Sequence, residues 1–585
     1  MALLRNVPRF RMACVAMALS VPGLILAQGT TRDGELVETI SVRVVNIDVV
    51  VTDRKGRPVE GLRAEDFRIF ETGRPVEVSH FYAHSDGVGD DQVATGPSET
   101  SDTASAERER SAFTVALYLD ERNLEPNQRA RIAQDLGDFL DAQAPDNVDL
   151  ILFSYADDLE VLAGPTRDVA DISAALQSAG QARGGRAIQP RTALRQAMAQ
   201  TRDAYEACEN AGANSAVGGI CEPCDDMWPD MIGYARTYSA GQQSRTADGA
   251  SALAEVVQTL AGLEGRKAVL FLGQGYEQRA GESMFSYLAD LCATDRPQAQ
   301  NEVFRTILEY DSTSRLEQLA AFANLHRVSL YMLDAGGVRA GQSTNVDFGS
   351  TKFRPSTLND RLFVENLQGT HNFLAEETGG RAILNTQRIG PDLENMFTEL
   401  GSATYSLGFV PDHPPTGLLY RLRVELVDPG RGWRVRYRKS YVDKILTERL
   451  AERLYSTLIL GSEQNPLGAQ ITASPSEDPA DKRARIELSI PASELLLVDS
   501  GPEAKEGQVR IWLASRDEEG RASELRQQFV DLGTDATQPG ADGIYRFSVR
   551  MQLEPGAHAV AAGVRDEVTG RESMVRTEVI VPAAG

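Results

Sequence analysis

The sequence has few of the residues from which catalytic and metal sites are usually built, with six histidines and five cysteines among 585 residues. It also lacks the Gly-x-Ser-x-Gly, His-Glu-x-x-His and Gly-x-x-x-x-Gly-Lys motifs that mark a nucleophile elbow, a zinc protease and a phosphate-binding loop. Any enzyme site would therefore have to be assembled entirely by the fold. We expect no enzyme activity, and we assign no catalytic or cofactor-binding residue.

Positive charge is also scarce, because 60 lysines and arginines face 84 aspartates and glutamates, which gives a formal net charge of -24. Nucleic-acid binding depends on clustered Lys and Arg, so this balance argues against a nucleic-acid partner. A soluble, self-repelling surface is the simpler explanation of the acidic excess.

Only one long apolar stretch is present, residues 12–26, and it follows Arg5, Arg9 and Arg11 and precedes Ala27. This order is typical of a cleaved secretory signal peptide, so we expect residues 1–27 to be removed and the mature chain to begin near Gln28. A membrane anchor is the alternative, but the stretch has about 15 residues against the roughly 20 that a spanning helix needs. The sequence therefore predicts an exported protein, periplasmic or at the cell surface, with no membrane insertion after cleavage.

Cleavage would remove Cys14 and leave four cysteines: Cys208, Cys221, Cys224 and Cys292. An even number of cysteines in an exported protein favours two disulfides, although the sequence does not fix their pairing. Zinc binding or redox chemistry by the "CEPC" pair is the alternative. The second Cys-x-x-Cys that would make a zinc site convincing is absent.

Changes in hydrophobic rhythm divide the rest of the chain into segments. Residues 36–84 alternate apolar and polar side chains in short runs, which predicts a small N-terminal β-sandwich. Residues 85–111 are polar and contain no aromatic residue, which predicts a disordered acidic linker. Residues 112–410 alternate apolar strands with amphipathic helices, which predicts a mostly parallel sheet covered by helices on both faces.

Four further segments are distinguished. Residues 209–244 are rich in Gly, Asn and Asp, so we expect a long, cysteine-bearing insertion loop. Residues 411–443 are predicted to form a β-hairpin extension, residues 444–460 a connecting helix, and residues 461–585 a C-terminal immunoglobulin-like β-sandwich.

One face of the predicted hairpin is strongly basic. It carries Arg421, Arg423, Arg434, Arg436 and Arg438. These side chains could dock against the acidic remainder of the chain or against a partner, or they could form a solvated outer face.

The α/β segment resembles the von Willebrand factor type A domain. The stretch "VVVTDRKGRPVEGLRAEDFRIFETGRPVEVSHF" before it, and the stretches "YSLGFVPD", "YRLRVELVD" and "RVRYRKSY" at and after its end, extend the similarity to the acidobacterial class of proteins related to that domain. The resemblance implies secretion, a Rossmann-like α/β core, and protein binding rather than catalysis.

Domains of this kind hold a divalent cation such as Mg²⁺ at the carboxyl ends of their strands. The ligands are an Asp-x-Ser-x-Ser motif on the first loop, a Thr on a second loop and often an Asp on a third. Here the first loop reads "DERNL", so Asp120 is kept while Arg122 and Leu124 stand at the two Ser positions. Arg122 also adds a positive charge, which would weaken a bound cation further.

The other two loops depart from the same pattern. Thr192, at the start of a predicted helix, matches the second-loop Thr, while Gly273 and Gln274 stand where the third-loop Asp is sought. The resemblance thus implies a degenerate metal-ion-dependent adhesion site, with no cofactor expected. The alternative is a metal-dependent adhesin in which Asp120, Asn123 and Thr192 still hold Mg²⁺.

From the sequence we therefore predict an exported, non-enzymatic protein–protein interaction or adhesion protein whose partner is a protein or a cell-surface ligand. An extracytoplasmic enzyme with an unrecognised site is the less favoured alternative.

Overall fold

The computed structural model describes residues 44–54, 56–83, 113–143, 147–181, 190–213, 221–337, 351–401, 404–428, 432–476, 483–499, 505–533 and 537–582. The predicted signal peptide (residues 1–27) and the predicted linker (residues 85–111) lie outside these residues. None of the described helices is long and apolar enough to cross a membrane.

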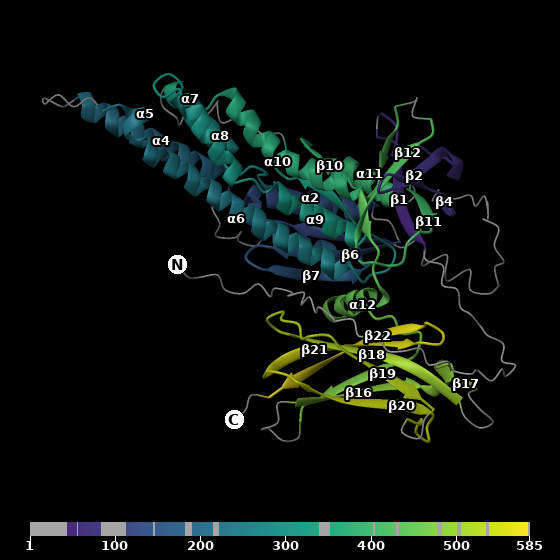
Figure 1. Cartoon of the computed structure of the whole chain (residues 1–585). Coiled ribbons are helices and arrows are strands. Elements are labelled where there is room, and N and C mark those ends of the chain that lie inside the picture. Colours follow the sequence, from purple (N-terminus) through teal and green to yellow (C-terminus); the bar gives the residue numbers. More distant parts are fainter. Residues whose placement is uncertain are drawn as a thin grey trace, which may run out of the picture. The chain divides into compact units, whose positions relative to one another are not determined.

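A six-stranded sheet forms the centre of the α/β domain (Figure 1). Its strands are β5 (Phe113–Leu119), β6 (Val148–Tyr155), β7 (Leu159–Thr166), β8 (Arg266–Gly273), β9 (Val328–Asp334) and β10 (Ala382–Ile383). In the order β10-β9-β8-β5-β6-β7, all neighbours are parallel except β6 and β7. This is the mostly parallel, Rossmann-like core that the sequence predicts.

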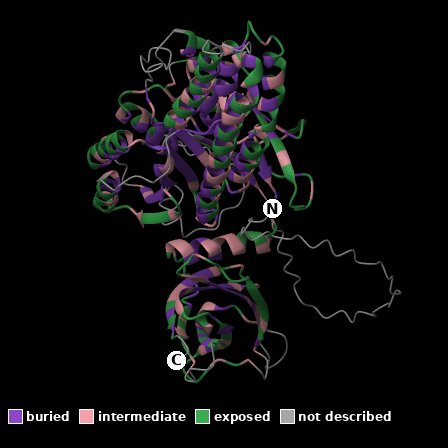
Figure 2. Cartoon of the chain, turned by 90° about the vertical axis from the view of Figure 1, so that its left-hand side faces the viewer, coloured by how far each residue is buried: buried purple, intermediate pink, exposed green. Residues whose placement is uncertain are grey.

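Strand β5 shows why this sheet is covered on both faces. All seven of its residues are buried, as expected for a central parallel strand. Val115 and Leu117 belong to one apolar core, and Ala116 and Tyr118 belong to the other. Figure 2 shows the resulting concentration of buried residues in the sheet and on the inner sides of the helices.

Helices supply the rest of each core. The first core contains residues of α2 (Pro126–Gln143), α3 (Val169–Gln181) and α11 (Gly390–Gly401). The second contains residues of α6 (Trp228–Leu260), α9 (Thr313–Leu325) and α10 (Thr357–Thr378).

The strands on either side of the α/β domain in the sequence pair with one another. They are β1 (Val45–Thr52), β2 (Phe67–Glu71), β3 (Arg74–Val76), β4 (His80–Ala83), β11 (Thr404–Phe409), β12 (Leu419–Leu426), β13 (Arg434–Arg436) and β14 (Ser440–Val442). They form two four-stranded sheets, β13-β1-β11-β4 and β14-β12-β2-β3.

This pairing differs from the expected division into an N-terminal sandwich (residues 36–84) and a separate hairpin extension (residues 411–443). Ile47 pairs with Leu407, and both are fully buried in one apolar core with Ile69 and Val424. The physical reason is that each set of short strands has one apolar face, which is buried only when the other set packs on it. Residues 36–43 lie outside the described part of the chain.

The basic face of the predicted hairpin is divided between two environments. Arg423 forms an ion pair with Glu425 at 2.5 Å and lies over the ring of Phe70. Arg436 instead pairs at 2.7 Å with Glu399, a buried carboxylate of α11, and donates to the carbonyl of Gly380. The Arg436 side chain therefore docks against the α/β domain, whereas Arg423 is paired locally.

Between residues 446 and 581, the described part of the chain contains one α-helix and eight strands. The helix is α12 (Leu446–Leu460), and the strands are β15 (Gln470–Ser474), β16 (Arg483–Pro491), β17 (Val498–Asp499), β18 (Lys505–Asp517), β19 (Arg526–Leu532), β20 (Ile544–Gln552), β21 (Gly556–Asp566) and β22 (Glu572–Val581). One sheet has the order β15-β16-β20, and the other contains β17-β18-β21-β22 with β19 paired to β18. Residues from both sheets share one apolar core.

The segment expected to be an insertion loop, residues 209–244, is largely helical, so that expectation is corrected. It contains the end of α4 (Pro190–Ala213), all of α5 (Pro223–Asp226) and the first half of α6, while residues 214–220 lie outside the described chain. Trp228, Met231, Ala235 and Tyr238 recur at helical spacing and are buried. They pack with residues of α4 and of α7 (Glu282–Leu291), which gives this polar segment an apolar seam.

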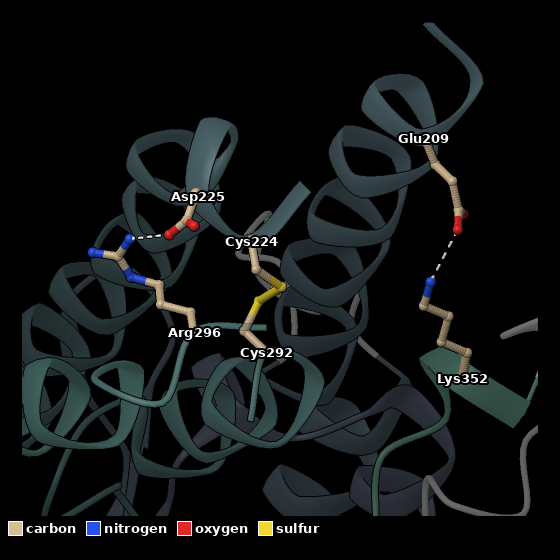
Figure 3. Close-up of a disulfide and its surroundings, with 6 residues drawn as sticks. All are labelled: Glu209, Cys224, Asp225, Cys292, Arg296 and Lys352. Atoms are coloured by element: carbon tan, nitrogen blue, oxygen red, sulfur yellow. Dashed lines mark hydrogen bonds and ion pairs between the residues drawn. A yellow bond between two sulfur atoms is a disulfide. The ribbon is translucent and has the colours of Figure 1, made fainter. Parts of the chain in front are cut away.

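We call α4, α5, the first half of α6, α7 and α8 (Ala299–Glu309) the helical extension (Figure 1). Two disulfides cross-link it: Cys208 with Cys221, and Cys224 with Cys292. The second joins α5 to the end of α7 and is flanked by the Asp225–Arg296 ion pair at 2.7 Å (Figure 3). The prediction of two disulfides is confirmed, and the structure supplies the pairing.

We predict that the mature protein contains no free thiol. Titration of thiols under denaturing conditions without reductant should detect none of the four cysteines, and the same titration after reduction should detect all four. Stoichiometric zinc recovered together with reactive thiols would contradict the disulfides.

Candidate functional site

The candidate site lies at the carboxyl ends of the central strands, the edge where open α/β sheets place their ligands. Asp120 follows β5 directly, and its backbone N–H donates to the carbonyl of Leu272 in β8 at 3.0 Å. Gly273 is so close that a Cβ added to it would lie 3.0 Å from the Cβ of Asp120. Gln274, the next residue, donates from its side chain to Gln128 at 2.8 Å. We call this edge of the sheet the rim.

The "DERNL" loop turns its side chains in different directions. Asp120 is fully buried, and its Oδ2 accepts a hydrogen bond of 2.8 Å from the amide nitrogen of Asn123. Arg122 donates to the hydroxyl of Tyr155 at 2.9 Å and pairs with Asp248 of α6 at 3.2 Å. Leu124 is buried in the apolar core. The side chains at the two Ser positions of the motif therefore serve the fold.

A buried ion pair holds this loop from the other side. Glu121 and Arg129 lie 3.0 Å apart, and both are nearly inaccessible to solvent. The hydroxyl of Ser154, in β6, donates to the second oxygen of Glu121 at 2.7 Å. This group was not predicted from the sequence, because its members come from three elements and match no motif.

Helix α6 contacts the loop after β5. Nη1 of Arg245 donates to Oδ1 of Asn123 at 3.2 Å. Glu277, buried in the loop after β8, accepts hydrogen bonds from the Tyr238 hydroxyl of α6 and, at 2.7 Å, from the backbone of Gly281. Neither Arg245 nor Glu277 was singled out from the sequence, because neither belongs to a motif and Arg245 follows directly after the segment expected to be a loop, residues 209–244.

Burial dominates the electrostatics of the two carboxylates. It raises the pKa of Asp120 to about 6, against the opposing effects of the hydrogen bond from Asn123, the nearby hydroxyl of Tyr276 and the charge on Arg122. Burial also raises the pKa of Glu277 to about 7, against the hydrogen bond from Tyr238. For Arg245, burial lowers the pKa, and the nearby charge of Arg122 lowers it further. The burial of the charged forms of Asp120, Glu277 and Arg245 thus costs folding free energy, which the neighbouring groups only partly offset.

Three buried oxygens of this group lie near one another, since Tyr276 interacts with both Tyr118 and Asp120. They are Oδ1 of Asp120 and the hydroxyls of Tyr118 and Tyr276, and none has a partner in hydrogen-bonding geometry among the described residues. The Tyr276 hydroxyl is nevertheless close enough to help lower the pKa of Asp120. Buried oxygens in this arrangement are suited to an ordered water molecule.

The residues do not fit the divalent cation that the resemblance implies. Thr192 is exposed in the first turn of α4 and accepts a 3.4 Å hydrogen bond from Arg195. No contact between Thr192 and Asp120 occurs among the described residues. Asn123 turns its amide nitrogen toward Asp120 and its oxygen toward Arg245, so it offers the carboxylate a donor where a metal would need a ligand oxygen.

The cysteines offer no alternative centre. The sulfurs of Cys208 and Cys221 and a carboxylate oxygen of Asp226 lie within 4.8 Å of one another. Both sulfurs, however, belong to a disulfide, and a metal ligand must be a thiolate.

We predict that Asp120→Asn will stabilise the protein at pH 8. Because the pKa of Asp120 is about 6 in the folded chain and about 3.9 in an unfolded chain, its contribution to the free energy of unfolding falls as the pH rises from about 4 to about 6. Above pH 6 the full cost, about 3 kcal/mol, is present. The variant should exceed the wild type by up to about 3 kcal/mol at pH 8 and equal it at pH 4, as measured by urea unfolding.

The exposed Asp230 provides the control, because Asp230→Asn should show no such dependence on pH. A variant Asp120→Asn that is less stable than the wild type at pH 8 would contradict the predicted cost of the buried charge.

Comparison with known proteins gives structural similarities only. No known protein family matches the sequence, and no curated protein matches it either. One similar solved structure is an aerotolerance-related membrane protein from Bacteroides fragilis, with a TM-score of 0.21 and 11% identity over 49% of this chain and 98% of that chain. Another is proximal thread matrix protein 1 from the mussel byssus with a zinc-occupied MIDAS motif, with a TM-score of 0.22 and 11% identity over 51% of this chain and 48% of that chain. A third is the conserved hypothetical protein BatB from Bacteroides thetaiotaomicron, with a TM-score of 0.19 and 10% identity over 49% of this chain and 98% of that chain.

Proposed function

We propose that this chain is an exported, non-enzymatic interaction protein that binds a protein or cell-surface ligand without a metal ion. The observation that carries the proposal is the burial and hydrogen bonding of Asp120. It is fully buried, hydrogen-bonded to Asn123, and close to arginines of its own chain. In this proposal, the rim holds no metal ion whose coordination a carboxylate of the partner could complete.

Export is supported by the disulfides as well as by the leader-like N-terminus. The pairs Cys208–Cys221 and Cys224–Cys292 would persist in an oxidising compartment and would be reduced in most cytosols. The proposed location is the periplasm or the cell surface.

The helical extension is the proposed binding element. Its α8 exposes two large apolar side chains four residues apart, Phe304 at 66% and Leu308 at 57% of their surface. Residues at this spacing share one face of a helix, so they form a continuous apolar contact. Apolar and aromatic anchors on a rigid support are typical of the centre of a protein–protein interface.

The first test is the effect of cations on stability. A cation bound only by the folded protein at 100 times its dissociation constant would add about 2.7 kcal/mol to the free energy of unfolding. We expect the melting temperature to be the same in chelator and in millimolar Mg²⁺, Ca²⁺ or Mn²⁺. A midpoint that falls with chelator in the wild type but not in Asp120→Ala would favour the metal-dependent adhesin instead.

The second test is capture of the partner by cross-linking in the native envelope, with chelator present. We predict that Phe304→Ser combined with Leu308→Ser will reduce capture at least about tenfold, because truncating two central apolar anchors costs more than 1.4 kcal/mol of binding free energy. Leu418→Ser is the matched control, since Leu418 is exposed to 62% but belongs to a different part of the chain.

Equal capture by the wild type and the double variant would exclude α8 as the contact. Capture that requires Mg²⁺ would exclude the proposed metal-free mode of binding.

A further inference from the structure

Helix α6 packs in the helical extension with its first half and on the central sheet with its second half, and residues between the two halves contact the rim. It has 33 residues, which correspond to about 50 Å at 1.5 Å per residue. Leu253, Val256 and Leu260 in its second half belong to the apolar core on the sheet. Trp228 and Met231 in its first half belong to the core of the extension instead. The stretch between the two halves contacts the rim, through Arg245, Asp248 and Gly249.

In this stretch, the loop after β5 and helix α6 each contribute one arginine that interacts with the other element. Arg122 of the loop forms an ion pair with Asp248 of α6 at 3.2 Å. Arg245 of α6 donates a hydrogen bond to Asn123 of the loop at 3.2 Å. The charges of Asp120 and Glu277 both favour the charged form of Arg245, whereas Arg122 opposes it. A positive charge from the helix thus stands beside the buried carboxylates of the rim.

Close backbone approach brings the helix near enough for these contacts. A Cβ added to Gly249 of α6 would lie 2.3 Å from the ring of Tyr276, in the loop after β8. A Cβ added to Gly281 would lie 1.7 Å from the hydroxyl of Ser239 in α6. Gly281 has a φ of +80°, which favours glycine independently of space. Two glycines therefore allow α6 to pack tightly against this loop.

We propose that α6 is an internal occupant of the rim, and that Arg245 supplies the positive charge that a divalent cation supplies in the domains this one resembles. The rim is closed by the chain itself, and a partner meets the helical extension. This inference deepens the proposed metal-free function, because it names the group that takes the place of the metal ion.

The test is a double-mutant cycle on the mature, full-length protein, because such a cycle isolates the interaction between two side chains. Arg245→Met removes the charge and retains most of the side-chain length. We expect it to raise the equilibrium constant for urea unfolding at pH 8 about tenfold in the wild type, since it leaves buried carboxylates without a counter-charge. In the Asp120→Asn background the same substitution should have an effect at least about threefold smaller.

Two further variants show whether charge is the cause. Arg245→Lys keeps the positive charge and should retain most of the stability that Arg245→Met loses. Arg236→Met removes an exposed arginine from the same helix and should change stability equally little in both backgrounds. Hydrogen exchange in residues 118–124 provides a local readout, and we expect it to accelerate in Arg245→Met only.

An effect of Arg245→Met that is identical in the two backgrounds, or no larger than that of Arg236→Met, would overturn the role of Arg245. That result would leave metal-free partner capture intact, so the two proposals fail separately. Binding of Mn²⁺ by the wild type, detected by electron paramagnetic resonance and lost in Asp120→Ala, would overturn both.

Discussion

The Asp120 carboxylate lies at the end of a buried strand with no exposure to bulk solvent, and the side chains of the surrounding rim interact with its charge. An ion in such a place costs several kcal/mol unless opposite charges and hydrogen bonds compensate it. Asn123 donates to one of its oxygens, and Arg122 and Arg245 bring positive charge close. The compensation is incomplete, because burial still raises the pKa of Asp120 to about 6. The carboxylate is therefore ionised at neutral pH at the expense of stability.

The same constraint explains why the loop after β5 and helix α6 cannot be considered separately. Arg122 and Arg245 are themselves partly buried, and each needs acceptors from the opposite element, Asp248 or Asn123. If α6 moved away, Arg122 would lose Asp248 and Asn123 would lose Arg245. The small size of Gly249 is part of the same arrangement, since any side chain there would collide with Tyr276 and hold the helix away from the rim.

The parts of the structure that depend on local pattern could be predicted from the sequence. The unbroken apolar run of β5 is typical of a buried strand, and the first-loop position of Asp120 after it was visible in the motif. The pairing of β1 with β11 could not be predicted, because Ile47 and Leu407 lie far apart in sequence and alternation alone does not specify a partner. The helix over residues 228–244 was missed because its polar and Gly-rich composition hid the spacing of Trp228, Met231 and Tyr238.

In the candidate site, too, only the features that depend on local sequence pattern could be predicted. The loss of two Ser ligands at Arg122 and Leu124 was visible in the sequence, because a known motif fixes their positions. Arg245 was not visible, because it lies 122 residues from Asn123 and belongs to no motif. The loss of metal ligands can thus be recognised from a short stretch of sequence. The residue proposed to supply the missing positive charge can be identified only from the tertiary structure.

An internal arginine also changes what kind of partner interface the chain can form. A metal ion with an open coordination position can gain much of its binding energy from one carboxylate of a partner, so a small contact area can suffice. The guanidinium of Arg245 is already engaged by its own chain and offers no such position. Affinity must then come from a larger, well-packed surface, and a rigid surface loses less conformational entropy on binding. The disulfides that cross-link α4, α5 and α7 provide this rigidity in the helical extension, which is the proposed binding element.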